Sequence, residues 1–170
     1  ADVWANKNLF QLKKDGTPIY GDQAVYNANK DEIQQAAGVH SILVNNGVVV
    51  NSDKSVIYAP RVAVGIKENG NVFFLLVDGR QSPYSKGLTL EQTAQLMKAR
   101  GAVWAGNLDG GGSATLVTRT PENPVFTVQN VPSDGWERKV ANSWQFVSNT
   151  ESDESYNAAL QAIRNAQLAA

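Results

Sequence analysis

The sequence predicts an α+β fold: a curved sheet, mixed or largely antiparallel, with two main helices packed on it and a helical tail at the C-terminus. Runs of β-branched and other apolar residues recur along the 170-residue chain, and short Asn-Gly or Asp-Gly sequences, which are typical of hairpin turns, join several of them. Fourteen glycines favour many turns. Segments with the spacing of an amphipathic helix are fewer than the strands.

The first half of the chain contains the predicted hairpins. Each consists of two apolar runs separated by a short polar turn that ends in glycine or contains it, such as Asp15-Gly16 or Asn46-Gly47. The paired runs are residues 9–12 with 17–20, 41–44 with 48–50, and 62–67 with 72–77.

Two helices are predicted from their end signals. Residues 29–38 have Asn29 as an N-cap, acidic residues in the first turn and Gly38 in the position of a C′ glycine. Thr89 and Gln92 form a capping-box pattern, after which apolar residues fall on one helical face until Gly101.

The second half is expected to add a buried strand over 102–107, with 114–118 as its continuation or partner, and strands over 125–128 and 140–147. Residues 148–155 are polar and acidic, and 156–170 have helical spacing. We therefore expect one domain over 1–147, followed by a linker and helix over 148–170. The start at Ala1 without Met leads us to expect that residues upstream are missing.

Composition excludes several classes of function. Fifteen Lys and Arg against sixteen Asp and Glu give a net charge of −1, which argues against nucleic-acid binding through a cationic face. No apolar stretch is long enough to span a membrane. The absence of cysteine excludes thiol nucleophiles, zinc–thiolate sites and disulfides, and a single histidine, His40, excludes a multi-histidine metal site.

The string Asn107-Leu108-Asp109-Gly110-Gly111-Gly112-Ser113 is the most unusual feature. Three consecutive glycines are expected where φ is positive or where another group approaches the main chain closely. Successive amides in such a turn can bind an oxyanion or phosphate, and the Ser113 hydroxyl adds a donor. The alternative is a tight turn without a ligand.

Asp78 and Asp109 each end an apolar run and precede glycine. If the two strands are neighbours, both carboxylates can face one pocket and divide the acid, base or nucleophile roles. The alternative is that each aspartate bonds its own turn. A further alternative makes the pair ligands of Ca²⁺ or Mg²⁺, although we expect no metal or other cofactor.

Three arginines lie at strand borders: Arg61, Arg80 and Arg138. Their guanidinium groups can converge on a phosphate with bidentate geometry. The alternative is surface ion pairs, with Arg138 meeting Glu137 or Asp134. His40, just before a predicted strand, is a further candidate site residue.

Six ordered blocks resemble the phosphodiester glycosidase family and span roughly residues 39–147. They are His40-Ser41-Ile42-Leu43-Val44, Pro60-Arg61-Val62-Ala63-Val64-Gly65, Val77-Asp78-Gly79-Arg80, Gly87-Leu88-Thr89-Leu90-Glu91, Asn107 to Ser113, and Glu137-Arg138-Lys139-Val140-Ala141-Asn142. The resemblance implies hydrolysis of a sugar-1-phosphodiester at the glycosidic bond. The N-terminal third departs from the family pattern, which its Asn6-Lys7-Asn8-Leu9-Phe10 echoes only loosely.

The resemblance and the residue patterns together predict a hydrolase acting on a phosphorylated glycan or cell-surface polymer. The expected catalytic residues are Asp78, Asp109, Arg61 and Arg138. The expected substrate-binding residues are Arg80, Asn107, Gly110, Gly111, Gly112, Ser113, Asn142 and His40.

The alternative is a non-catalytic module that binds phosphoglycans, for instance a phage or cell-surface adhesion domain. In either case we expect an extracellular, cell-surface or phage-particle location, and the C-terminal helix could serve assembly.

Overall fold

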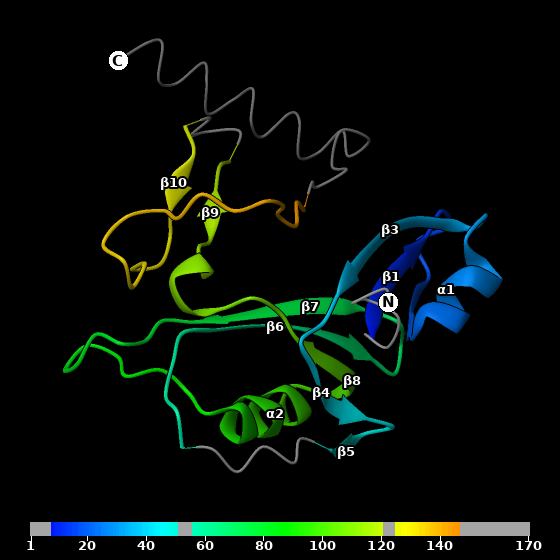
Figure 1. Cartoon of the computed structure of the whole chain (residues 1–170), viewed down its shortest axis with the longest axis horizontal. Helices are drawn as coiled ribbons and strands as arrows, with labels where there is room; N and C mark the ends of the chain where they lie inside the picture. The colour runs from blue at the N-terminus through cyan, green and yellow to red at the C-terminus, as the bar shows by residue number, and fades with distance from the viewer. Residues whose placement is uncertain (1–7, 51–55, 121–124, 147–170) are drawn as a thin grey trace, which may run out of the picture.

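The computed structural model describes residues 8–50, 56–120 and 125–146 (Figure 1). At its centre is a five-stranded sheet with the order β5-β4-β8-β6-β7, in which every pair of neighbours is antiparallel. Its strands are β4 (Ser41–Asn45), β5 (Val48–Val49), β6 (Arg61–Lys67), β7 (Val72–Val77) and β8 (Ala102–Asn107).

The predicted hairpins are confirmed: β1 (Leu9–Lys13) pairs with β2 (Pro18–Gly21), β4 with β5, and β6 with β7. The turn between β4 and β5 places both Asn46, at φ 49°, and Gly47, at φ 72°, in the left-handed region. Asn and Gly adopt this conformation more readily than other residues, so the turn residues themselves determine the hairpin.

Helix α2 (Leu90–Ala99) covers one face of the five-stranded sheet (Figure 1). Its capping box is present: Gln92 N donates to the Thr89 hydroxyl at 3.1 Å, and Thr89 N donates to Gln92 Oε1 at 3.0 Å. Leu90, Ala94 and Met97 are buried against apolar residues of the sheet. This prediction is confirmed, and the helix start that it fixes lies beside the candidate site.

The other face of the sheet packs against a smaller, three-stranded sheet with the order β2-β1-β3, where β3 is Ile33–Gly38. Phe10 of β1 is buried between the layers, stacked on Trp104 of β8 at a centroid distance of 6.3 Å and meeting Phe74 of β7 edge-on at 6.4 Å. The described part of the chain therefore has three layers, with α2 and the small sheet on opposite faces of the main sheet.

The predicted helix over 29–38 is wrong. A helix, α1 (Gln23–Asn29), ends there instead: the Asp22 carboxylate caps its start by accepting from Ala24 N and Val25 N. Residues 33–38 form β3, which pairs with β1 in an antiparallel register. The cap signals at Asn29 and Gly38 do not produce a helix, because the ladder of backbone hydrogen bonds between β3 and β1 stabilises this segment more than a cap does. Helix α1 contacts β1 and β2, so α2 alone of the two described helices packs on the main sheet.

The segment after β8 also differs from expectation. Residues 114–118 neither continue β8 nor pair with it: a 3₁₀ turn over Gly111–Ser113 follows, and β9 (Val117–Thr118) pairs with β10 (Thr127–Val128). The strand expected over 140–147 is absent from 140–146, where Trp144 contacts the Phe10 and Phe74 rings without strand pairing.

The α+β class holds, with mostly antiparallel strands and two helices in the described part. The predicted linker and helical tail over 148–170 lie outside the described residues. None of the described helices combines the length and the apolar character needed to cross a membrane.

Candidate active site

Strand register gathers the predicted site residues at one edge of the main sheet. Arg61, the first residue of β6, pairs with Val77 at the end of β7. Asn107, the last residue of β8, pairs with Ser41 at the start of β4 and with Ala63 of β6. Antiparallel pairing therefore places the starts of β4 and β6 beside the ends of β7 and β8, where the loops carrying polar residues begin.

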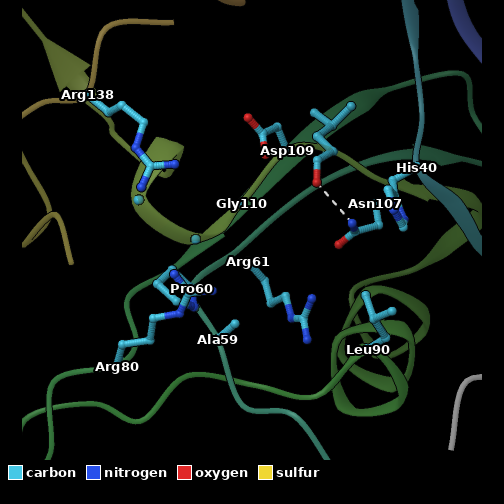
Figure 2. Close-up of a pocket in the computed structure, with 13 residues that line it drawn as sticks. His40, Ala59, Pro60, Arg61, Arg80, Leu90, Asn107, Asp109, Gly110 and Arg138 are labelled. Atoms are coloured by element: carbon cyan, nitrogen blue, oxygen red, sulfur yellow. Dashed lines mark hydrogen bonds between the residues drawn. The ribbon is translucent and has the colours of Figure 1, made fainter. Parts of the chain in front are cut away.

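A pocket of about 320 Å³ opens at this edge (Figure 2). Such a volume is at the lower end of the range for small-molecule sites, about 300–1,000 Å³. In Figure 2, Arg80 and Arg138 lie on one side of the pocket and Asn107 and His40 on the other. The lining residues are His40, Ala59, Pro60, Arg61, Arg80, Leu90, Asn107, Leu108, Asp109, Gly110, Gly111, Gly112 and Arg138.

The three glycines each allow a close approach. A β-carbon on Gly110 would lie 2.7 Å from Pro60 O, and one on Gly111 would lie 3.1 Å from Arg80 Nη1. Gly111 also has a φ of +57°, in the left-handed region. A β-carbon on Gly112 would collide with the side chains of Arg138 and Asp134. Each glycine is therefore explained by a close contact, and two of the contacts are with arginines of the pocket.

Some of the loop amides that were expected to bind an anion already donate to backbone carbonyls. Gly111 N donates to Pro60 O at 3.0 Å, and Ser113 N donates to Gly110 O at 3.1 Å, so these amides already have acceptors. In residues 8–50, 56–120 and 125–146, the amides of Gly110 and Gly112 donate no hydrogen bond. Those two amides remain as donors for an anion.

Arg61 is held by backbone carbonyls. Its Nε donates to Leu88 O and its Nη2 to Ile57 O, each at 2.9 Å. The Leu88 carbonyl lies just before α2, and Ile57 lies just before β6. The half-buried guanidinium thus fastens together two of the segments that form the pocket wall.

Arg138 reaches the pocket from the segment after β10. Its Nε and Nη2 donate to Asp134 Oδ2 at 2.9 and 2.7 Å, an ion pair with i, i+4 spacing. The ion pair considered from the sequence, with Asp134 as the partner, is therefore present. Arg138 nevertheless lines the pocket, because the paired side chains of Arg138 and Asp134 pack against Gly112 on the side where a β-carbon would lie.

Arg80 differs from the other two arginines of the pocket. Within the described residues its guanidinium makes no hydrogen bond or ion pair, and its backbone has a φ of 60°, which is uncommon for a residue other than glycine. Backbone strain of this kind occurs often at functional sites. Because no described residue bonds its guanidinium, all of the side-chain N–H donors of Arg80 are available to a ligand in the pocket.

Asp78 does not line the pocket. Its Oδ1 accepts from Asn130 Nδ2 at 2.8 Å, and its Oδ2 accepts from Tyr84 Oη at 2.9 Å and Val131 N at 3.0 Å. Partial burial raises the pKa of Asp78, but these hydrogen bonds from Asn130, Val131 and Tyr84 outweigh it and leave the pKa below its ordinary value. The hydrogen bond that Tyr84 Oη donates to Asp78 raises the pKa of Tyr84.

Asp109 is exposed and lines the pocket, the one predicted carboxylate that the structure places there. The two aspartates therefore do not share the pocket, and Asp78 bonds neighbouring segments rather than its own turn. The described residues contain no cluster of three or more metal-ligating side chains.

The other predicted residues are divided between the pocket and its surroundings. His40 is exposed at the pocket wall, and its amide donates to Asn107 O at 2.8 Å. Asn107 donates from Nδ2 to Leu108 O, while its buried Oδ1 has no hydrogen-bond partner within the described part of the chain. Ser113 and Asn142 do not line the pocket, and Asn142 is exposed. The roles of all these residues stay predictions.

Sequence reasoning missed Asn130, which bonds Asp78. No spacing or motif signal marks it, because its partners lie far away in the chain. The sequence predicts Asp134 as an ion-pair partner of Arg138, but nothing in it indicates that Asp134 lies against Gly112.

Comparison with known proteins agrees with the resemblance. A family model described as phosphodiester glycosidase matches residues 1–147. The chain belongs to the phosphodiester glycosidase family. Two relatives are the N-acetylglucosamine-1-phosphodiester alpha-N-acetylglucosaminidases of Bos taurus and Homo sapiens, which are 27% and 25% identical over 144 residues. These matches cover 74% of this chain and 26% of each relative, so the chain spans about a quarter of their length.

The fold of this phosphodiester glycosidase domain is shared with a solved relative. The zebrafish N-acetylglucosamine-1-phosphodiester alpha-N-acetylglucosaminidase catalytic domain, auto-inhibited by its pro-peptide, matches with a TM-score of 0.60 at 24% identity. The match covers 75% of this chain and 45% of that one.

Proposed function

We propose that the chain hydrolyses the glycosidic bond of a glycosyl-1-phosphodiester. Water adds to the anomeric carbon, the bond from that carbon to the phosphate oxygen breaks, and the products are a free sugar and a phosphate monoester. The observation that carries the proposal is a single pocket in a phosphodiester glycosidase fold where three arginines and Asp109 surround a glycine loop.

The residues of the pocket suit this chemistry. Guanidinium groups and the amides of Gly110 and Gly112 stabilise the negative charge that grows on the departing phosphate. A phosphate monoester is a good leaving group, so its oxygen need not be protonated and one carboxylate is enough. Asp109 acts on the anomeric carbon as nucleophile, or on the attacking water as base.

Phosphorylated glycans and cell-surface polymers are the substrate class that we propose. The curated relatives are named for N-acetylglucosamine-1-phosphodiesters. The methyl ester of α-N-acetylglucosamine 1-phosphate contains the same bond and is therefore a suitable first probe.

The test is release of N-acetylglucosamine and methyl phosphate from this probe. We expect turnover by the wild type and a loss of about 10²- to 10⁴-fold in kcat in Asp109→Asn, the usual contribution of acid–base catalysis. Asp31→Asn, which removes an exposed carboxylate that does not line the pocket, is the matched control. Equal turnover by wild type and Asp109→Asn would remove Asp109 from the mechanism.

A binding module is the second candidate, and one observation favours it. Among the described residues, Asp109 is the only carboxylate that lines the pocket, whereas glycosidases ordinarily use two. Calorimetric titration with the same probe decides between the two: saturable binding by a wild type that releases no sugar over a long incubation would establish the binding module.

A further inference from the structure

The side chain of Asn130 joins three segments that are distant in the sequence. Its Nδ2 donates to Asp78 Oδ1 at 2.8 Å and to Ala114 O at 3.0 Å, while its Oδ1 accepts from Leu116 N at 2.8 Å. Both amide hydrogens and the amide oxygen are therefore used, which fixes the orientation of the amide.

The next residue strengthens the attachment. Val131 N donates to Asp78 Oδ2 at 3.0 Å, and Val131 O accepts from Gln81 Nε2 at 2.7 Å. Residues 130–131 are therefore fastened to the end of β7 and the loop after it. The segment that begins there, residues 130–138, carries both Asp134 and Arg138.

Asn130 links the two chain segments that meet where Arg138 contacts Gly112 in the pocket. Ala114 and Leu116 directly follow the glycine loop, so their bonds to Asn130 hold that loop from its C-terminal side. The segment 130–138 brings Arg138 onto Gly112 of the same loop. Asn130 thus connects the two chain segments whose separation decides where the Arg138 guanidinium lies.

We propose that Asn130 is a positioning residue, which together with Asp78 places Arg138 against Gly112 in the pocket. The inference rests on the proposed function for its effect on activity, although the placement of Arg138 can be measured without any substrate. Asn130 itself does not line the pocket. Asp78 then contributes to the reaction through Asn130 and Val131 rather than by contact with the anomeric carbon.

The first experiment measures placement. In the full chain, nuclear Overhauser contacts between the Gly112 α-protons and the Arg138 side chain report whether the two still meet. We expect these contacts in the wild type and in Gln129→Ala, a matched control whose side-chain amide, among the described residues, donates to Thr127 O two positions earlier and not to the glycine loop or to Asp78. We expect their loss in Asn130→Ala. A folded Asn130→Ala that keeps them would overturn the proposal, whatever the protein hydrolyses.

The second experiment is a double-mutant cycle on hydrolysis of the methyl phosphodiester probe. Misplacing a substrate-contacting group by about 1 Å can cost up to about a hundredfold in rate, so Asn130→Ala should lower kcat/KM by between about ten- and a hundredfold. In an Arg138→Ala background the same change should cost less than about threefold, because residues that act through one another are not additive. Equal losses in the two backgrounds would contradict the proposal.

The third experiment guards against loss of folding. The reciprocal exchange Asp78→Asn with Asn130→Asp keeps one amide and one carboxylate facing each other. We expect it to recover part of the activity and thermal stability that either single change loses. If the single change Asp78→Asn loses stability little but turnover fully, and the exchange recovers none, Asp78 is a catalytic residue and the proposal is wrong.

A wild type that neither binds nor hydrolyses the probe would overturn the proposed function alone. In that case the nuclear Overhauser measurement still decides whether Asn130 places Arg138.

Discussion

The side chain of Arg138 lies over the α-carbon of Gly112, in space that a β-carbon would fill. Asp134, which accepts two hydrogen bonds from Arg138, occupies the same space. A β-carbon at position 112 would therefore force the ends of both side chains to move, so Gly112 and Arg138 together form this wall of the pocket.

Gly112→Ala should displace the Arg138–Asp134 pair. A β-carbon at this position overlaps the two side chains where they now lie and would push Arg138 away from the loop, so we expect the phosphodiester KM to rise by about tenfold or more, the loss of roughly one charge-assisted contact. Gly38→Ala is the matched control, because a β-carbon there meets no atom of the described residues within 4 Å. Steady-state kinetics on both variants make the comparison, and an unchanged KM in Gly112→Ala would show that Arg138 does not contact the substrate.

Gln11→Met should stabilise the protein. Gln11 is fully buried on β1, and among the residues that the structure describes neither its Oε1 nor its Nε2 has a hydrogen-bond partner. An unpaired buried polar group costs about 1–3 kcal/mol, and methionine has a similar size without that cost. Chemical denaturation should show a gain of about 1 kcal/mol or more. The exposed Gln35→Met on β3 controls for a general effect of methionine. A loss of stability in Gln11→Met would indicate a partner for the amide.

How much of this structure follows from the sequence depends on how local the deciding interactions are. The hairpin at Asn46-Gly47 and the capping box of Thr89 were predicted correctly, because the residues that decide them are next to one another. The helix expected over 29–38 was wrong, because pairing with β1, far away along the chain, outweighs the local signals.

The candidate site shows the same limit. The sequence predicted that Arg61, Arg80, Arg138 and Asp109 meet at the glycine loop, and the structure places all of them at one pocket. It could not predict that Asp78 turns away toward Asn130, since that bond joins residues 52 positions apart and no motif contains both of them.

The contribution of Asp78 to stability should depend on pH. Its carboxyl has a folded pKa below the ordinary 3.8, so the contribution is complete above the unfolded pKa and is lost as pH falls through the folded pKa. Wild type should therefore be more stable than Asp78→Asn at pH 7 by about 1.5–3 kcal/mol, the range for hydrogen bonds to a charged group. The difference should shrink below about pH 4. Urea denaturation across this range tests it, and a difference that grows toward acid would reverse the sign of the shift.

Arg80 and Arg61 should separate ligand binding from stability. The Arg80 guanidinium makes no hydrogen bond or ion pair within the described residues, and its backbone bond to Lys86 O survives the substitution, so Arg80→Ala should leave the free energy of unfolding within about 0.5 kcal/mol of the wild type. The same change should weaken binding of inorganic phosphate by about ten- to a hundredfold, because hydrogen bonds to charged groups contribute about 1.5–3 kcal/mol. Arg61→Ala should lower stability by about 1–3 kcal/mol, since the carbonyls of Leu88 and Ile57 lose their donor.

Lys139→Ala, an exposed change of equal charge beside Arg138, controls for a general electrostatic effect. Calorimetric titration with phosphate and urea denaturation provide the two measurements. Should Arg80→Ala bind phosphate as tightly as Lys139→Ala does, the anion is held by other groups of the pocket.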